Sequence, residues 1–304
     1  MTVILDGGLA TELEARGHDL SDRLWSARLL LDDPAAVEEV HLAYFRAGAQ
    51  VATTGSYQAT IPGFEAGGLD RATALAAIRA SATIARRARD RFAEETGTDA
   101  GSLLIAGSVG PYGAMLADGS EYRGDYAPGR DVLRDLHAPR MEALLEAGVD
   151  LLALETIPNI PEAEVLVELL DELGASGWLS FQCRDAGHTA AGEPIETAVR
   201  VGAGVTGLVA IGVNCTAPRF LPGLLERAAP TAAGLPLIAY PNVGDAWDAA
   251  HHVWVARDED GTFRPAVVAS WSGVGATWLG GCCGTGPSDI AALAGSLRPT
   301  VRPS

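Results

Sequence analysis

Short apolar runs alternate with helix-forming stretches along the whole chain, and this alternation limits the possible folds more than any other feature. The apolar runs are nearly continuous rather than alternating with polar residues, as is typical of parallel strands buried on both faces of a sheet. The runs that we predict as strands are Val3–Gly8, Ala49–Ser56, Leu103–Pro111, Asp150–Thr156, Trp178–Arg184, Gly207–Cys215, Pro236–Asn242 and Ala276–Cys283.

Helical stretches fill the intervals between these runs. The first has an acidic residue and a proline at its start and Gly48 after its end, which are typical helix boundaries. The predicted helices are Pro34–Ala47, Leu69–Glu95, Asp131–Ala147, Pro161–Leu173, Pro194–Val201, Arg219–Ala229 and Pro287–Leu297.

Eight strand–helix alternations in 304 residues are what a (β/α)₈ barrel requires. The alternative, a doubly wound sheet, usually has fewer strands and a glycine fingerprint after the first one. No linker or change of composition divides the sequence. We therefore predict an α/β protein whose residues 1–304 form a single-domain TIM barrel.

Charge and composition exclude several classes of partner. The net charge of −17 argues against binding to nucleic acid or to an anionic membrane surface. No apolar run approaches the roughly 20 residues that cross a bilayer, and the first residues do not resemble a secretory signal. The 4 cysteines are too few for a disulfide scaffold, so we expect a cytoplasmic protein.

Two segments are longer than ordinary connections, namely Tyr112–Gly129 and the stretch from Gly244 to Pro265. Both follow the carboxyl end of a predicted strand, where a barrel builds its active site. They are candidate lids, although surface insertions without function would have the same appearance.

Three of the 4 cysteines stand at the carboxyl ends of predicted strands, where a barrel gathers its functional side chains. Cys215 ends the sixth run, and Cys282 and Cys283 end the eighth. Three thiolates with an open fourth position are a plausible catalytic zinc site.

Glycines surround the cysteine pair at positions 280, 281 and 284. Adjacent side chains on a strand point to opposite faces, so two neighbouring thiols reach one metal only if the strand breaks its alternation. We expect these glycines to allow that break.

The residues alone leave other interpretations open. Cys282 and Cys283 could be small packing residues, or one could be a nucleophile, although no histidine stands at a strand end to activate it. A strained disulfide between the neighbours is a third possibility. The glycine-rich stretch before Pro287 could also bind phosphate, although no Lys or Arg stands close by.

Several longer motifs resemble the homocysteine S-methyltransferase family, and most closely its branch that uses S-methylmethionine or S-adenosylmethionine. The resemblance extends from about Ile4 to Leu293. It is carried by ILDGGLATELEARGHDLSDRLWSARLL, AGAQVATTGSYQAT, AGSVGPYGAMLADGSEYRGDY, LLALETIPN, GVNCTAP, YPN and GGCCGTGPSDI. After Asn242 the sequence departs from the family pattern, with Val243 and Asp245 where close relatives often carry Ser and Glu.

The resemblance implies a (β/α)₈ barrel in which Cys215, Cys282 and Cys283 hold Zn²⁺ and the homocysteine thiolate takes the fourth position. It also implies that the amino acid end of homocysteine binds at Asp6, Gly7 and Glu155.

By this resemblance the enzyme moves a methyl group from a sulfonium donor to homocysteine, giving methionine. Asp6 and Glu155 would take the ammonium group, and the Gly7 N–H the carboxylate. Candidate aromatic contacts for the donor cation are Tyr57, Tyr112, Tyr240 and Trp247.

Two further expectations follow from the resemblance. No cobalamin or folate module is expected, because the sequence ends soon after the helix that follows the eighth predicted strand. A monomer or a weak homo-oligomer is expected, since no extra assembly segment is evident. The alternatives are a non-catalytic barrel that binds zinc or an amino acid, and a betaine-type methyl donor.

Overall fold

A computed structural model describes residues 2–20, 26–243, 246–248, 253–255 and 263–297. Eight parallel strands form one sheet in the order β1-β10-β7-β6-β5-β4-β3-β2. A parallel bridge between Leu5 and Val51 joins the two edges, so the sheet closes into a barrel. The bounds of its strands are β1 Val3–Ile4, β2 Val51–Thr53, β3 Leu104–Val109, β4 Leu151–Ile157, β5 Gly177–Phe181, β6 Leu208–Asn214, β7 Leu237–Tyr240 and β10 Ala276–Leu279.

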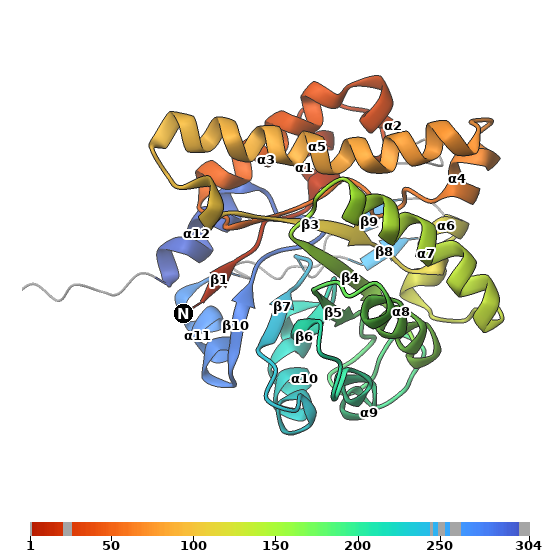
Figure 1. The fold of residues 1–304 in the computed structure, drawn as a ribbon. Helices are drawn as coiled ribbons and strands as arrows, with labels where there is room; N and C mark the ends of the chain where they lie inside the picture. The colour runs from red at the N-terminus through yellow and green to blue at the C-terminus, as the bar shows by residue number, and fades with distance from the viewer. Residues whose placement is uncertain (1, 21–25, 244–245, 249–252, 256–262, 298–304) are drawn as a thin grey trace, which may run out of the picture.

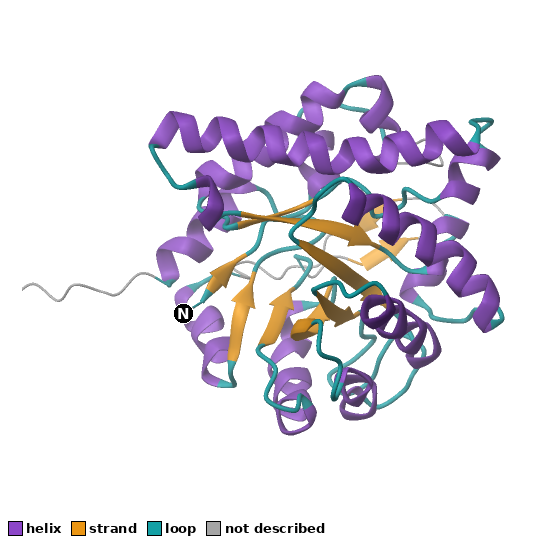
Figure 2. Cartoon of the chain, in the orientation of Figure 1, coloured by secondary structure: helices purple, strands orange, loops and turns teal. Residues whose placement is uncertain are grey.

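Helices surround the strands, as Figures 1 and 2 show. One helix or more follows each strand, except that two short strands come between β7 and its helix. The helices are α1 Leu9–Ala15, α2 Ser26–Asp32, α3 Pro34–Ala47, α4 Ile61–Ala66, α5 Arg71–Thr96, α6 Tyr112–Leu116, α7 Arg130–Glu146, α8 Ile160–Glu172, α9 Ile195–Val199, α10 Leu221–Ala228, α11 Pro265–Gly273 and α12 Pro287–Ser296. The predicted (β/α)₈ barrel is therefore confirmed.

Local sequence signals set the helix ends most clearly in α3. The Asp33 side chain accepts a hydrogen bond from the Ala36 N–H at 3.1 Å, and Pro34 occupies the first turn. Gly48 ends the helix with a φ of 109°, a left-handed conformation that glycine adopts without strain. The observed bounds of α3 are the predicted ones.

The core has two layers, which explains why the strand runs are apolar throughout. Inside the barrel, residues such as Leu5, Trp178 and Ile238 pack against one another. Their neighbours along the strands, such as Leu179 and Leu237, face outward and pack against the helices. Each strand thus buries both faces.

The two long segments contain elements that the sequence did not predict. The first contains α6 and the short 3₁₀ turn η2, Ser120–Tyr122. The second contains an antiparallel pair, β8 Ala246–Asp248 and β9 Val253–Val255, and ends where α11 begins. Residues 244–245, 249–252 and 256–262 lie outside the described part of the chain. The lid role of both segments stays a prediction.

Among the described residues, no helix combines the length and the apolar character needed to cross a membrane.

Candidate active site

A pocket opens at the carboxyl ends of the barrel strands, and strands from both ends of the chain contribute to it. It holds about 700 Å³ of space not filled by protein, part of which is open solvent. Its lining consists of Asp6, Gly7, Gly8, Leu9, Ala10, Thr11, Thr53, Thr54, Gly55, Tyr57, Ser108, Tyr122, Glu155, Thr156, Cys215, Tyr240, Gly281, Cys282 and Cys283.

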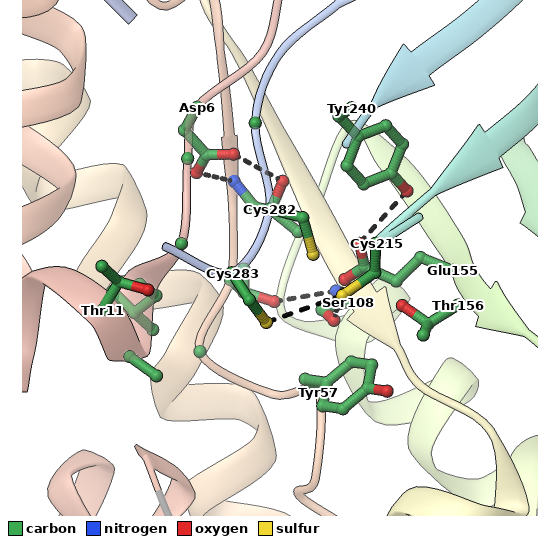
Figure 3. A pocket seen from close by; sticks show the side chains of 18 of the residues that line it. Asp6, Thr11, Tyr57, Ser108, Glu155, Thr156, Cys215, Tyr240, Cys282 and Cys283 are labelled. Atoms are coloured by element: carbon green, nitrogen blue, oxygen red, sulfur yellow. Dashed lines mark hydrogen bonds between the residues drawn. The ribbon is translucent and has the colours of Figure 1, made fainter. Parts of the chain in front are cut away.

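The three predicted cysteines come together in this pocket, and Figure 3 shows their side chains meeting there. The sulfur atoms of Cys215, Cys282 and Cys283 all lie within 4.8 Å of one another. The Sγ atoms of Cys215 and Cys283 are 3.6 Å apart. Tetrahedral zinc with sulfur at about 2.3 Å requires sulfur atoms roughly 3.8 Å apart. The donor set and its spacing therefore fit a zinc ion.

The thiols also alter one another's acidity. Hydrogen bonds from Cys215 and Cys282, and a further one from Tyr122, lower the pKa of the Cys283 thiol well below its usual value. All 4 cysteines are free thiols, so the vicinal disulfide interpretation finds no support.

The turn after β10 places Cys282 and Cys283 by packing closely against its neighbours. The Cys282 N–H donates to the Pro241 carbonyl at 2.7 Å, and the Gly281 N–H donates to the Asp6 carbonyl at 3.0 Å. A Cβ atom at Gly281 would lie 2.1 Å from the Thr285 methyl group, so there is no room for a side chain.

The glycines of this turn differ in what they provide. A Cβ at Gly280 would lie 2.5 Å from that of Leu5, so this position, like Gly281, needs glycine for space. Gly284 alone of the three adopts a positive φ, +80°. The three glycines thus permit this turn in different ways, Gly280 and Gly281 by the space they leave and Gly284 by its positive φ.

The end of β6 places Cys215 in a different way. Cys215 has a φ of 46°, and Thr156 at the end of β4 has a φ of 60°. Such left-handed conformations are strained for residues other than glycine. Asn214 connects the two sites, because its Oδ1 accepts from the Thr156 N–H and its Nδ2 donates to the Thr156 hydroxyl, both at 2.8 Å.

Two buried carboxyl groups, Asp6 and Glu155, form the polar side of the pocket (Figure 3). Asp6 accepts hydrogen bonds from the Thr53 N–H at 2.7 Å and from the Thr53 hydroxyl at 2.9 Å. Burial raises the pKa of Asp6 to about 8 despite these bonds. Glu155 accepts from the Ser108 and Tyr240 hydroxyls, and burial raises its pKa to about 7.

Gly7, the third residue predicted to bind substrate, also lines the pocket. A Cβ atom there would lie 2.7 Å from the Thr285 carbonyl oxygen and 2.9 Å from the Tyr44 ring. The Tyr44 hydroxyl bonds the carbonyl oxygens of Gly8 and Thr285, both at 2.9 Å, and so ties the first strand-end loop to the last.

The aromatic candidates divide into three groups. Tyr57 and Tyr240 line the pocket, whereas Tyr112 is absent from the described lining and packs against the Tyr126 ring, with 5.4 Å between centroids. The side chain of Trp247 lies outside the described residues.

Of the two positions that depart from the family pattern, Asp245 also lies outside the described residues. Val243 is described, and its N–H donates to the Cys283 carbonyl at 3.1 Å.

Two polar lining residues, Thr11 and Tyr122, lie outside the predicted strand runs and were missed by sequence reasoning. Thr11 lies in α1, which is only 7 residues long, and its hydroxyl accepts a bond from the Gly284 N–H at 2.8 Å. Tyr122 lies in η2, inside the long segment after β3. The length of that segment was the available signal, but no periodicity identified the residue.

Two other interpretations lose support from the lining. Among the lining residues that the structure describes, there is no histidine to activate a cysteine nucleophile and no Lys or Arg to bind phosphate.

Comparison with known proteins agrees with this geometry. A sequence model of the homocysteine S-methyltransferase family matches residues 3–297. The homocysteine S-methyltransferase of Escherichia coli strain K12 is 49% identical over 96% of this chain and 94% of its own length. Homocysteine S-methyltransferase YbgG of Bacillus subtilis strain 168 is 43% identical over 98% of this chain and 96% of its own.

A solved structure gives the same result. The metallated form of the homocysteine methyltransferase MmuM from Escherichia coli superposes with a TM-score of 0.86. It is 47% identical and covers 97% of this chain and 96% of its own. The chain described above therefore belongs to the homocysteine S-methyltransferase family.

Proposed function

We propose that residues 1–304 form one homocysteine-binding domain that transfers a methyl group from a sulfonium donor to homocysteine, with Zn²⁺ as cofactor. S-methylmethionine is the proposed donor, with S-adenosylmethionine second, and the product is methionine. The observation that carries the proposal is the group of three thiols from two separate strand ends, beside two buried carboxyl groups in one pocket.

Cys215, Cys282 and Cys283 are the proposed zinc ligands. Three sulfur donors are typical of zinc among the common metals, and they leave a fourth position for the substrate sulfur. Bound zinc would supply a Lewis acid that keeps the homocysteine sulfur ionised at neutral pH. The structure of the Escherichia coli relative is described as metallated, which supports a metal in this family.

Asp6 and Glu155 are proposed to bind the ammonium group of homocysteine. Their pKa values of about 8 and about 7 show that burial penalises both carboxylates when no cation is present. A substrate ammonium would compensate for that penalty. The described lining lacks Lys and Arg, so the substrate carboxylate is left to donors such as the Gly7 N–H.

A cationic methyl donor suits the remaining surface. The described lining combines acidic groups with Tyr57, Tyr122 and Tyr240, whose rings can contact a sulfonium. A betaine-type donor carries a positive charge too and remains the alternative donor. An anionic folate is disfavoured by the same acidic lining.

In the proposed step, the homocysteine sulfur forms a bond to the methyl carbon while the carbon–sulfur bond of the donor breaks. The electron pair of that bond goes to the donor sulfur, so S-methylmethionine leaves as a second methionine. The thiol proton is released when homocysteine binds as the thiolate.

The protein's main contribution to rate is alignment. A free thiol near pKa 8.5 is only a few per cent ionised at pH 7, so complete ionisation accelerates the reaction by at most about 30-fold, or roughly 2 kcal/mol. Holding the two reacting atoms in line can contribute about 7–11 kcal/mol. Asp6, Glu155 and the tyrosines are proposed to do this by fixing both substrates.

The test is a panel of S-methylmethionine, S-adenosylmethionine, betaine and methyl-folate, each assayed with homocysteine before and after treatment with a chelator. We expect about one zinc per chain, methionine from the sulfonium donors, and loss of turnover on chelation that added zinc restores. Full activity in metal-free protein would overturn the zinc proposal, and binding without turnover of any donor would favour a non-catalytic barrel.

A further inference from the structure

A second polar cluster lies outside the pocket, between α7 and α8. It consists of His137 and Arg140 on α7 and Glu162 on α8. The exposed fractions of His137 and Glu162 are 0%, and that of Arg140 is 1%. Burying three such groups is costly unless each has a specific partner, so their contacts indicate what they do.

The hydrogen bonds of the cluster have a fixed direction. Arg140 Nη2 lies 2.7 Å from His137 Nδ1, and His137 Nε2 lies 2.8 Å from Glu162 Oε1. A guanidinium can only donate, so Nδ1 accepts and the ring proton sits on Nε2, which donates to Glu162. Burial lowers the pKa of His137 to about 4, which agrees with a neutral ring.

The remaining bonds of the cluster go to the segment after β3. Arg140 Nη2 donates to the Gly110 carbonyl, and the Tyr112 N–H donates to Glu162 Oε1 at 2.6 Å. The Tyr126 hydroxyl donates to Glu162 Oε2. The cluster therefore holds the segment at its beginning and again about fifteen residues later.

Between these attachment points, η2 carries Tyr122 into the pocket lining. Next to it, Glu121 is also buried. A Cβ atom at Gly113 would lie only 2.5 Å from the Glu121 backbone nitrogen, so α6 and η2 pack directly against each other. A shift of either end of the segment is thus transmitted to Tyr122.

We infer that Arg140, His137 and Glu162 form a positioning network that sets Tyr122 for the methyl donor. This inference rests on the proposed function. Of the residues proposed to bind homocysteine, Asp6 lies after β1 and Glu155 within β4. Both have their own hydrogen bonds, to Thr53, Ser108 and Tyr240. The segment after β3 is left to form the donor side.

The first test variant is Tyr126→Phe, which removes one hydroxyl and one bond to Glu162. We expect the KM for S-methylmethionine to rise about threefold to tenfold, the effect of one hydrogen bond. The KM for homocysteine should change less than about twofold. Both values are measured with zinc in excess, because Tyr122 also hydrogen-bonds the proposed zinc ligand Cys283. Hydrogen exchange of peptides within residues 112–126 should become faster, with or without zinc.

A second variant, Glu162→Gln, removes the charge of the carboxylate that accepts three hydrogen bonds. The KM for S-methylmethionine should rise further, by about 10-fold or more, because hydrogen bonds to a charged group are stronger. The matched control is Glu168→Gln on the same helix, where an exposed carboxylate pairs with Arg130. This control should leave both KM values and the exchange rates unchanged.

The inference is overturned if Tyr126→Phe leaves exchange in residues 112–126 unchanged, or if it raises both KM values equally. A Glu162→Gln protein that does not fold leaves Tyr126→Phe to decide. If the wild-type chain turns over no sulfonium donor, the proposed function fails. The attachment of the segment is tested separately by hydrogen exchange, and it is overturned if Tyr126→Phe leaves the exchange rate of residues 112–126 unchanged.

Discussion

Two turns bring cysteines to the same point, and they are built by opposite means. After β10, glycines give the chain room to approach β1 and Thr285, and Gly284 takes the one left-handed conformation without strain. At the end of β4 and directly after β6, Thr156 and Cys215 take left-handed conformations that are strained for these residue types. Asn214 stabilises this arrangement by its two hydrogen bonds to Thr156. One turn depends on the absence of side chains, the other on a side chain that stabilises a strained backbone.

The largest effect is expected from removing a thiol on either turn. Cys215→Ala should lower zinc affinity by far more than the roughly 10–100-fold typical of residues outside the metal's own ligands. Cys282→Ala and Cys283→Ala should have the same effect, since each of the three cysteines offers one sulfur atom to the metal. Competition with a chromophoric chelator measures the affinity. A Cys215→Ala protein that keeps full zinc occupancy would contradict the proposed ligand set.

Filling the space at the glycine turn should have the next largest effect. Gly281→Val places a side chain where its first carbon already meets Thr285 at 2.1 Å, so the turn must move. We expect zinc affinity to fall about 10–100-fold although no ligand is removed. The control is Gly295→Val in α12, where a Cβ atom meets nothing within 4 Å. Equal zinc affinity in the two variants would refute this account of the glycine turn.

Removing the side chain that stabilises the strained turn should have a smaller effect, on the stability of the fold. Asn214→Ala removes two hydrogen bonds to Thr156 and should lower the free energy of unfolding by about 1–3 kcal/mol. Urea denaturation measures this change. Adding Thr156→Gly should recover part of the loss, because glycine adopts a positive φ without strain. No recovery would mean that strain at Thr156 is not what Asn214 opposes.

The smallest expected effect comes from His41, which lies in α3 and in neither turn. Its contribution to the pH dependence of stability must be known before any such dependence is assigned to the turns. Burial in α3 lowers the pKa of His41 to about 4, and within the described part of the chain neither ring nitrogen has a hydrogen-bond partner. In the unfolded chain the pKa of His41 is about 6.5, so the unfolded state binds more protons between pH 6.5 and 4. The contribution of neutral His41 to the free energy of unfolding is therefore complete above about pH 6.5 and is lost as the pH falls toward 4.

From pH 8 to pH 6, His41 should lower the free energy of unfolding by less than about 1 kcal/mol. His41→Leu should remove this share of the pH dependence, as measured by denaturation at both pH values. A variant with the wild-type pH dependence would show that His41 is not its source.

The barrel could be predicted because parallel strands buried on both faces leave continuous apolar runs. The cysteine group could be predicted because a barrel brings all strand ends to one mouth, whatever their separation in sequence. The left-handed conformations of Thr156 and Cys215 could not be predicted. They depend on the hydrogen bonds between Thr156 and Asn214, the residue before Cys215, and these bonds form only because β4 and β6 both lie beside β5. Tyr122 was missed because short loop elements carry no periodicity.

The closing seam of the barrel has a consequence for how the protein is made. Asp6 donates its N–H to the Val51 carbonyl in β2, and its own carbonyl accepts the Gly281 N–H after β10, so β1 is joined at this residue to the second strand and to the last. The cysteine pair follows Gly281 directly, and Cys215 waits two strands away. The three thiols therefore come together only once the final strand has docked beside the first. The proposed zinc site would be absent from an unfinished chain, which would have no assembled site with which to sequester the metal.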